Sequence, residues 1–304
     1  MRKAERHAAE ILRLAVTLSL LGLVACGDST GLEGEGEGVL GEWVRSGGEN
    51  RTYVLRLPPS YEEGQPTPLL ILFHGAGGTG AGFQASIAMD STADEAGFIT
   101  VYPDGLNGVW YQEDVRFTRT LISHLSEGLS IDPERIYAAG FSRGATLGFY
   151  LACAMSTELA GVASVGATML LSTAQACDPS HGIPIIFIQG TADPAFPWNG
   201  ATVGDDVLLP MSETVSAWTW FNECPNDPIV ESLPDTVEDG TQVQTSLYES
   251  CRAGSEVMLY TVHGGGHTWP GSPYEWPAWT GTVSREINAS EEIIKFFQRH
   301  PPGE

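Results

Sequence analysis

Basic side chains are scarce in this chain of 304 residues. Lysine and arginine together number 15 against 38 aspartates and glutamates, which gives a formal net charge of −23 at pH 7. At long range such a charge repels nucleic acid, anionic lipid headgroups and acidic polysaccharides, so these are poor partners. Neutral or weakly charged substrates fit the composition better.

The apolar stretch near the N-terminus is too short to span a membrane comfortably. It covers residues 14–25 and follows several basic residues, which is the pattern of an export signal. Its end, Leu23-Val24-Ala25-Cys26, resembles the bacterial lipobox, in which the cysteine is lipidated and becomes the mature N-terminus. We therefore expect a signal peptide over residues 1–25 and a lipid anchor on Cys26. The alternative is a plain signal peptide followed by an incidental cysteine.

Glycine and glutamate alternate after Cys26 without apolar periodicity. Residues 26–38 are therefore expected to form a flexible tether between the anchor and a single catalytic domain of residues 39–304. The expected location is the bacterial cell envelope, as a lipoprotein of the outer membrane or cell surface, or the exterior as a secreted protein. Contact with a membrane is expected only through the lipid anchor.

Cysteine is rare, and no Cys-x-x-Cys pair exists, so a zinc site is not expected. Apart from Cys26 there are four cysteines, an even number for an exported protein, and two disulfides are the default expectation. Three pairings are possible, and we favour the local ones, Cys153 with Cys177 and Cys224 with Cys251. Four reduced, buried thiols are the alternative.

Short apolar runs alternate with amphipathic segments of helix length along the rest of the chain. This alternation predicts an α/β fold, with a mostly parallel central sheet covered by helices on both faces. Expected strands cover residues 53–57, 69–73, 98–102, 135–139, 162–165, 183–188 and 257–262, and expected helices cover residues 83–95, 114–129, 145–155, 212–222 and 290–298. No internal repeat or separate binding module is seen, and segment 223–245 is expected to be a long excursion between a helix and a strand.

Ser142 is the candidate nucleophile. It lies in Gly-Phe-Ser-Arg-Gly between an expected strand and an expected helix, where a tight turn exposes a serine hydroxyl for attack on a carbonyl. Ser29 lies in a second Gly-x-Ser-x-Gly match, but no strand precedes it and no apolar helix follows it. Ser29 is therefore discarded.

A serine nucleophile needs a base, and the base needs an acid that fixes its tautomer. Asp193 follows the expected strand 183–188, and His267 lies in the glycine-rich loop after the expected strand 257–262. Asp205 and Asp206 compete as the acid but lie farther from a strand end. His263 competes as the base, but it is still close to its strand.

Backbone N–H groups that stabilise a tetrahedral oxyanion complete such a site. The glycine-rich turn after residues 69–73 suits this role, with the N–H of Ala76 as one donor and the N–H of Arg143 as the other. A phosphate loop is disfavoured, because no Gly-Lys-Ser/Thr ending follows. The paired histidines 263 and 267 do not match a metal-ligand pattern, so neither a metal nor a cofactor is expected.

These motifs resemble the secreted polyhydroxybutyrate depolymerases and feruloyl esterases of the α/β-hydrolase superfamily. The resemblance runs from about residue 51 to residue 297. The matching motifs are His74-Gly75, Tyr102-Pro103-Asp104-Gly105, Ile131-Asp132-Pro133, Gly190-Thr191-Ala192-Asp193 and Gly265-Gly266-His267-Thr268-Trp269-Pro270-Gly271. The resemblance implies an α/β-hydrolase fold, ester hydrolysis through Ser142, Asp193 and His267, and local disulfides.

Two features depart from the family pattern. Arg143 places a cation directly after the serine, at a helix N-terminus, where such proteins usually carry a small or amide residue. It either extends to solvent or recognises an anionic group at the mouth of the site. Segment 110–114 keeps the family's acidic pattern only in part and is assigned no role.

The expected partner is an ester substrate, either a polyester oligomer or an acylated polysaccharide. Several tryptophans lie on expected loops, and Trp198 and Trp269 are expected to line the substrate site because each is close in sequence to a triad residue. A peptidase of the same fold and a binding lipoprotein with a relic site are the alternatives. A peptidase would need a recognition site for a peptide terminus, and none is seen.

Overall fold

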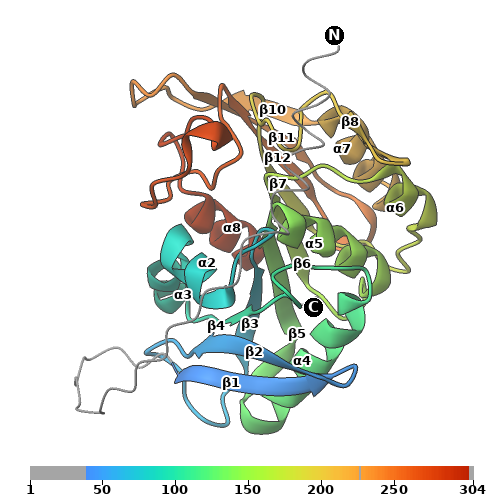
Figure 1. The fold of residues 1–304 in the computed structure, drawn as a ribbon. Helices are drawn as coiled ribbons and strands as arrows, with labels where there is room; N and C mark the ends of the chain where they lie inside the picture. Colours follow the sequence, from blue (N-terminus) through green and yellow to red (C-terminus); the bar gives the residue numbers. More distant parts are fainter. Residues whose placement is uncertain (1–38, 226, 301–304) are drawn as a thin grey trace. The chain divides into compact units, whose positions relative to one another are not determined.

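A single ten-stranded sheet organises the part of the chain that the computed structural model describes, residues 39–225 and 227–300. In spatial order its strands are β1 (Val39–Ser46), β2 (Glu49–Arg56), β4 (Ile99–Pro103), β3 (Thr67–Phe73), β5 (Ile131–Phe141), β6 (Gly161–Val165), β7 (Ile185–Gly190), β12 (Val257–His263), β11 (Gln242–Tyr248) and β10 (Ile229–Ser232) (Figure 1). The six central strands, β4, β3, β5, β6, β7 and β12, are parallel to one another. At both edges of the sheet, each further strand is antiparallel to its neighbour. The mostly parallel sheet is therefore confirmed.

The expected signal peptide, Cys26 and the tether lie outside the described residues. Ser29 lies there as well.

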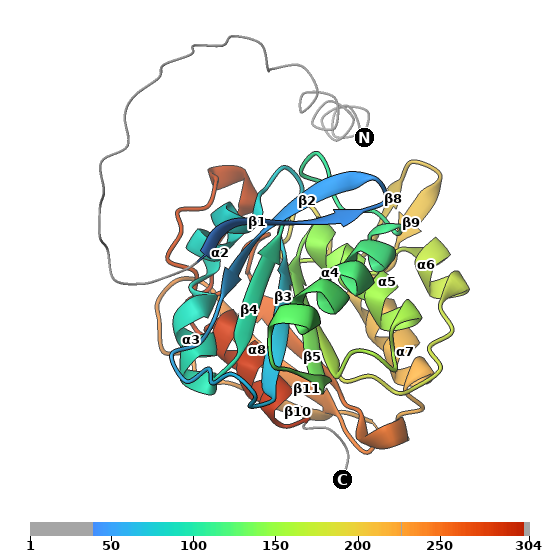
Figure 2. The same ribbon diagram turned by 90° about the horizontal axis from the view of Figure 1, so that it is seen from below.

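Both faces of the sheet are covered by helices, because alternate residues of the central strands are apolar on either side. In β3, Leu69 and Ile71 pack into one apolar layer, and Leu70 and Leu72 pack into the other. Figures 1 and 2 show the two groups of helices on opposite faces. On one face lie α4 (Asp114–Gly128), α5 (Arg143–Ala154), α6 (Leu171–Ala176) and α7 (Met211–Phe221), and on the other lie α2 (Gly80–Ile87), α3 (Met89–Ala96) and α8 (Ala289–Gln298). None of these helices is both long and apolar enough to cross a membrane.

Two expectations about local structure were wrong. The single helix expected over residues 83–95 is divided into α2 and α3 at Ala88, whose φ of 49° is left-handed. Segment 223–245, expected as an irregular excursion, contains β10 and the start of β11. All residues of β10 are exposed, so this edge strand has none of the apolar run that reveals a buried strand.

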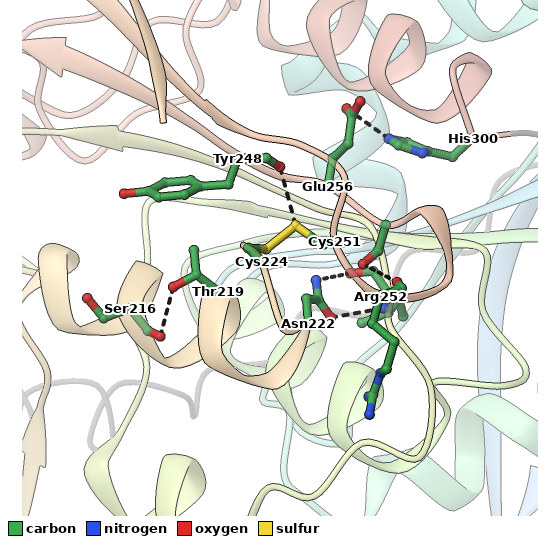
Figure 3. Close-up of a disulfide and its surroundings, with 11 residues drawn as sticks. Ser216, Thr219, Asn222, Cys224, Tyr248, Cys251, Arg252, Glu256 and His300 are labelled. Atoms are coloured by element: carbon green, nitrogen blue, oxygen red, sulfur yellow. Dashed lines mark hydrogen bonds and ion pairs between the residues drawn. A yellow bond between two sulfur atoms is a disulfide. The ribbon is translucent and has the colours of Figure 1, made fainter. Parts of the chain in front are cut away.

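The structure contains both disulfides in the local pairing. Cys153, in the last turn of α5, pairs with Cys177 directly after α6, and their Cα atoms are 5.1 Å apart. Cys224, after α7, pairs with Cys251, and their Cα atoms are 4.1 Å apart (Figure 3).

A buried asparagine fixes the end of α7 next to this second disulfide. The side chain of Asn222 donates to the Ile183 carbonyl and accepts from the Ile183 N–H, and its own carbonyl accepts from the Arg252 N–H. Figure 3 shows Asn222 between α7 and the chain at Arg252. The loop before β7 and the loop before β12 are thereby joined to one helix end.

Candidate active site

Ser142 lies in a strained turn between β5, which ends at Phe141, and α5, which begins at Arg143. Its φ of 56° and ψ of −118° are unfavourable for a residue with a side chain. The Ser142 N–H donates to the Val165 carbonyl at 2.9 Å, which holds the turn against the end of β6. The tight turn between a strand and a helix that was expected from the sequence is therefore present.

The two glycines of Gly-Phe-Ser-Arg-Gly are needed because backbone segments approach closely on both sides of the turn. A Cβ atom on Gly140 would lie 2.3 Å from the backbone of Gly144, and a Cβ atom on Gly144 would lie 2.0 Å from the Phe73 carbonyl oxygen. Both distances are shorter than any real carbon contact. The end of β5, the start of α5 and the end of β3 therefore meet without intervening side chains.

His267 lies between the serine and the aspartate. Its Nε2 atom is 3.0 Å from Ser142 Oγ, and its Nδ1 atom is 2.8 Å from Asp193 Oδ2. All three residues are buried, and Ser142 keeps 8% of its surface exposed. When Nδ1 carries the proton and donates it to the carboxylate, Nε2 is free to accept the serine proton. The structure thus brings together three side chains that lie far apart in the sequence.

Asp193 is held as an acceptor by its own loop. Its Oδ1 atom accepts hydrogen bonds from the backbone N–H groups of Ala195 and Phe196, each at 2.8 Å. Its side chain has no exposed surface. A carboxylate buried with backbone donors on one oxygen keeps the other oxygen directed at the imidazole.

Aromatic rings enclose the imidazole of His267. The ring centroids of Phe141 and Phe196 lie 4.7 and 5.8 Å from that of His267. Trp279, in the short helix η2 (Ala278–Thr280), lies at 6.2 Å and is stacked, yet 63% of this tryptophan is exposed. The backbone N–H of His267 donates to the carbonyl of Thr280, in the same segment, at 2.6 Å. This hydrogen bond fixes the loop that carries the histidine.

The glycine-rich turn after β3 lies directly beside the serine. A Cβ atom on Gly75 would be 3.4 Å from the Cβ atom of Ser142. Within residues 39–225 and 227–300, the backbone N–H groups of Ala76 and Arg143 have no hydrogen-bond acceptor. Both N–H groups are therefore free to donate to a ligand atom.

His74 stabilises this turn through hydrogen bonds that require a neutral imidazole. Its Nδ1 atom donates to the Gly75 carbonyl at 2.7 Å, and its Nε2 atom accepts from the Gly105 N–H at 2.9 Å. Burial is the main cause that lowers the pKa of His74, while the hydrogen bond to Gly75 opposes this shift. Trp110 donates from Nε1 to the His74 carbonyl and so fixes the backbone at the start of the turn.

Several other sequence candidates lie elsewhere. Trp269 was expected to line the substrate site, but this prediction is wrong: it has no exposed surface, packs against Phe83 and donates to Ser290. Trp198 is partly buried, and its substrate-lining role stays a prediction. Of the competitors, His263 is exposed at the end of β12, and Asp206 accepts hydrogen bonds from Ser172 in the hairpin of β8 (Ala201–Val203) and β9 (Asp206–Leu208).

Arg143 contacts the loop after β4. Its Nη2 atom donates to the Trp110 carbonyl at 3.0 Å. The guanidinium therefore joins the start of α5 to the segment that supports the glycine-rich turn. In segment 110–114, which was assigned no role, Trp110 and Asp114 are buried, and Asp114 pairs with Arg51 at 2.7 Å.

Gln189 and Trp279 are not among the site residues predicted from the sequence. Gln189 is a polar residue at the end of an apolar strand, and such an exception was the signal that could have identified it. Trp279 lies on an expected loop, but it is twelve residues from His267, and its contact with the imidazole depends on how the loop folds back. Within the described residues, no group of three or more His, Cys, Asp or Glu side chains is arranged to hold a metal ion.

Comparison with known proteins places this site in a family. A family model described as Phospholipase/Carboxylesterase matches residues 111–219, which include Ser142 and Asp193. The protein NocK of Nocardia uniformis subsp. tsuyamanensis, named as a candidate esterase, is 30% identical over 277 residues, which cover 82% of this chain and 80% of NocK.

Two named feruloyl esterases are also similar. Feruloyl esterase D of Neurospora crassa is 27% identical over 238 residues, 72% of this chain and 74% of that protein. Feruloyl esterase B of Piromyces equi is 26% identical over 235 residues, which are 71% of this chain but only 42% of that protein.

Among solved structures, the acetyl xylan esterase from Aspergillus awamori shares the fold. Its TM-score is 0.59 at 14% sequence identity, with 85% of this chain and 98% of that chain covered. The expected α/β-hydrolase fold is thereby confirmed. The chain belongs to the feruloyl esterase-like family of α/β-hydrolases and is a carboxylic ester hydrolase.

Proposed function

We propose that the protein cleaves carboxylic esters through an acyl-enzyme on Ser142, with His267 as general base and acid and Asp193 as the residue that orients it. The observation that carries this proposal is the buried hydrogen-bonded line from Ser142 Oγ through both nitrogens of His267 to Asp193 Oδ2. A serine hydroxyl is a weak nucleophile by itself, and in this arrangement the imidazole of His267 can accept its proton.

The reaction follows from this arrangement. As Ser142 Oγ attacks the ester carbonyl, its proton passes to His267 Nε2, and the negative charge of Asp193 stabilises the imidazolium that forms. The carbonyl oxygen becomes an oxyanion, which accepts hydrogen bonds from the free N–H groups of Ala76 and Arg143. His267 then protonates the departing alcohol. Water, activated by the same imidazole, releases the acid and restores the serine.

The substrate class that we propose is an ester of a polysaccharide, with a feruloyl or acetyl group as the acid. The names of the similar feruloyl esterases support an aromatic acid, and the exposed ring of Trp279 beside His267 offers a flat apolar surface for it. The net charge of −23 favours an uncharged substrate over an acidic polymer. Hydroxyalkanoate oligomers are the other ester that the sequence motifs suggest.

We also propose that the protein acts outside the cytoplasm. The positively charged and apolar N-terminal residues support export, and Leu23-Val24-Ala25-Cys26 supports a lipid anchor. The structure contains two disulfides, and disulfides are typical of proteins in oxidising compartments. Detection of diacylglyceryl-modified Cys26 by mass spectrometry would test the anchor, and a free or cleaved N-terminus without lipid would exclude it.

The activity is tested by the purified protein and a Ser142→Ala variant on methyl ferulate, acetylated xylan, hydroxybutyrate oligomers and a peptide amide. We expect hydrolysis of the first two, no cleavage of the amide, and a loss of about a thousandfold or more in kcat for Ser142→Ala. Ser126→Ala, at an exposed position of α4, is the matched control and should keep full activity. A Ser142→Ala variant as active as the wild type would reject the mechanism, and a higher rate on hydroxybutyrate oligomers would move the substrate to polyesters.

A further inference from the structure

Gln189 is a buried polar residue that the proposed mechanism does not use. It is the fifth residue of β7, has 1% of its surface exposed, and follows four apolar residues. Its side-chain Nε2 atom lies 3.2 Å from Asp193 Oδ2 and 3.0 Å from the Phe196 carbonyl oxygen. The amide is therefore in contact both with the proposed acid and with the loop that follows it.

The contacts of Gln189 determine which way its amide points. The Gly190 carbonyl oxygen, at 3.5 Å, is the third neighbour of Nε2, so all three neighbours are acceptors. A flipped amide would direct an oxygen at three acceptor oxygens, which is repulsive. The amide NH₂ group therefore faces the carboxylate, and within residues 39–225 and 227–300 the Oε1 atom has no hydrogen-bond partner.

An unpartnered buried oxygen destabilises the folded state, so packing alone does not favour glutamine at this position. Methionine has a similar length and shape and would remove the orphaned Oε1 atom, but it would leave the Phe196 carbonyl oxygen without this donor. Stability alone therefore does not explain a glutamine at the end of β7, whereas the contacts with Asp193 and Phe196 require a donor.

We propose that Gln189 is a positioning residue that holds the Asp193 carboxylate and the Phe196 ring against His267. One amide hydrogen binds Oδ2, the same oxygen that accepts from His267 Nδ1, and the other binds the Phe196 backbone. The ring of Phe196 stacks on the imidazole with an interplanar angle of 18°. A single side chain thus fixes the partner on one edge of the imidazole and the ring on one of its faces.

Gln189 also limits the negative charge that Oδ2 presents to the imidazole, because this oxygen accepts two hydrogen bonds instead of one. Without the amide donor, the carboxylate would stabilise the imidazolium more strongly, so the pH dependence of catalysis should change. The titratable groups that face Gln189 are Asp193 directly and His267 through Oδ2. On β12, Gln189 is paired with Thr261, which is uncharged. On the β6 side, the N–H of Gly166, which is also uncharged, donates to the carbonyl of the preceding residue, Ile188.

This inference rests on the proposed function and is tested with Gln189→Met in the full protein. We expect a fall of about tenfold in kcat with KM changed by less than about twofold, because substrate contacts remain and only the triad geometry loosens. The acid limb of the pH profile of kcat/KM should move to higher pH, while Tm changes little, because the loss of the orphaned Oε1 offsets the loss of the donor to Phe196. Gln298→Met, at an exposed position at the end of α8, is the control and should change none of these values.

Gln189→Glu keeps the shape and makes the donor depend on pH. A protonated glutamic acid donates to one of the two acceptors, but its ionised form repels Asp193. Activity should therefore approach the wild-type value at low pH and fall as pH rises through a range in which the wild type is constant. A Gln189→Met variant with unchanged kcat and acid limb, or a Gln189→Glu profile parallel to the wild type, would overturn the proposal. Failure of the proposed function is distinguished by Ser142→Ala, which would then keep its activity.

Discussion

His74 shows how a single buried side chain prepares the site without touching the three proposed triad residues. Both nitrogens of its ring are used: Nδ1 donates to the Gly75 carbonyl, and Nε2 accepts from the Gly105 N–H. Only the neutral imidazole can do both. A proton on Nε2 would convert the acceptor into a donor that faces an N–H group, and the glycine-rich turn beside Ser142 would lose its support.

The lowered pKa of His74 makes a prediction about stability. In the unfolded chain, this histidine binds a proton near its ordinary pKa of 6.5, whereas burial keeps it neutral in the folded protein to lower pH. The free energy of unfolding should therefore decrease as pH falls below about 6.5, and the decrease should be complete below the folded pKa.

Urea unfolding of the wild type and of His74→Gln at about pH 7.5 and about pH 5.5 measures this contribution. The variant lacks the titrating ring, so its free energy of unfolding should fall less between the two pH values than that of the wild type. Equal decreases in the two proteins would show that His74 is not held neutral.

At the residue scale, the sequence identified the groups whose chemistry depends on local context. Ser142, Asp193 and His267 each follow an apolar run, and position after a buried strand is a property of the sequence itself. Side chains whose role depends on folding-back of loops were not identifiable in this way. Trp269 is close to His267 in the sequence, but its ring packs against Phe83 in the apolar layer. Trp279 is farther away in the sequence, yet its ring stacks on the imidazole of His267.

The elements that carry the site are tied together at the ends remote from it. Ser142 precedes α5, and Cys153 lies at the opposite end of that helix. His267 follows β12, and Cys251 precedes that strand. Each disulfide therefore restrains an element that carries a site residue without contacting the site.

Removing a disulfide should therefore lower stability much more than activity. The bridges close loops with sequence separations of 24 and 27 residues, for which chain entropy gives about 3.5 kcal/mol each. We expect the free energy of unfolding, measured with urea, to fall by about this amount in each of the double variants Cys153→Ser/Cys177→Ser and Cys224→Ser/Cys251→Ser. At a temperature where the variants stay folded, kcat should change by less than about threefold. A loss of kcat as large as that of Ser142→Ala would contradict this separation.

At the element scale, the buried strands were predictable and the edges were not. Strands such as β3 and β7 are apolar on both faces, so they appear as continuous apolar runs. The edge strand β10 is exposed along its whole length, and the hairpin of β8 and β9 pairs strands of three residues, so neither has such a run. The break between α2 and α3 depends on a left-handed Ala88, a conformation that alanine does not favour.

The topology of the whole sheet explains why residues 142, 193 and 267 meet. Strands β5, β7 and β12 are parallel, so their carboxyl ends lie along one edge, and the loops after them share that edge. The order serine, acid, histidine follows the order of these strands in the chain. The parallel sheet could be predicted from the sequence, and with it the convergence, but the distances could not, because they depend on loops such as the one that Thr280 fixes.

Every step of the proposed reaction requires that His267 activates Ser142. The most direct test is to treat the purified protein with an alkyl fluorophosphonate, which reacts with serine hydroxyls that a neighbouring base deprotonates, and to locate the adduct by intact mass and peptide mapping. We expect a single phosphonyl group on Ser142, much slower labelling of His267→Ala, and no labelling of Ser142→Ala. Labelling of a different serine, or equal labelling of Ser142 in the wild type and His267→Ala, would contradict this activation.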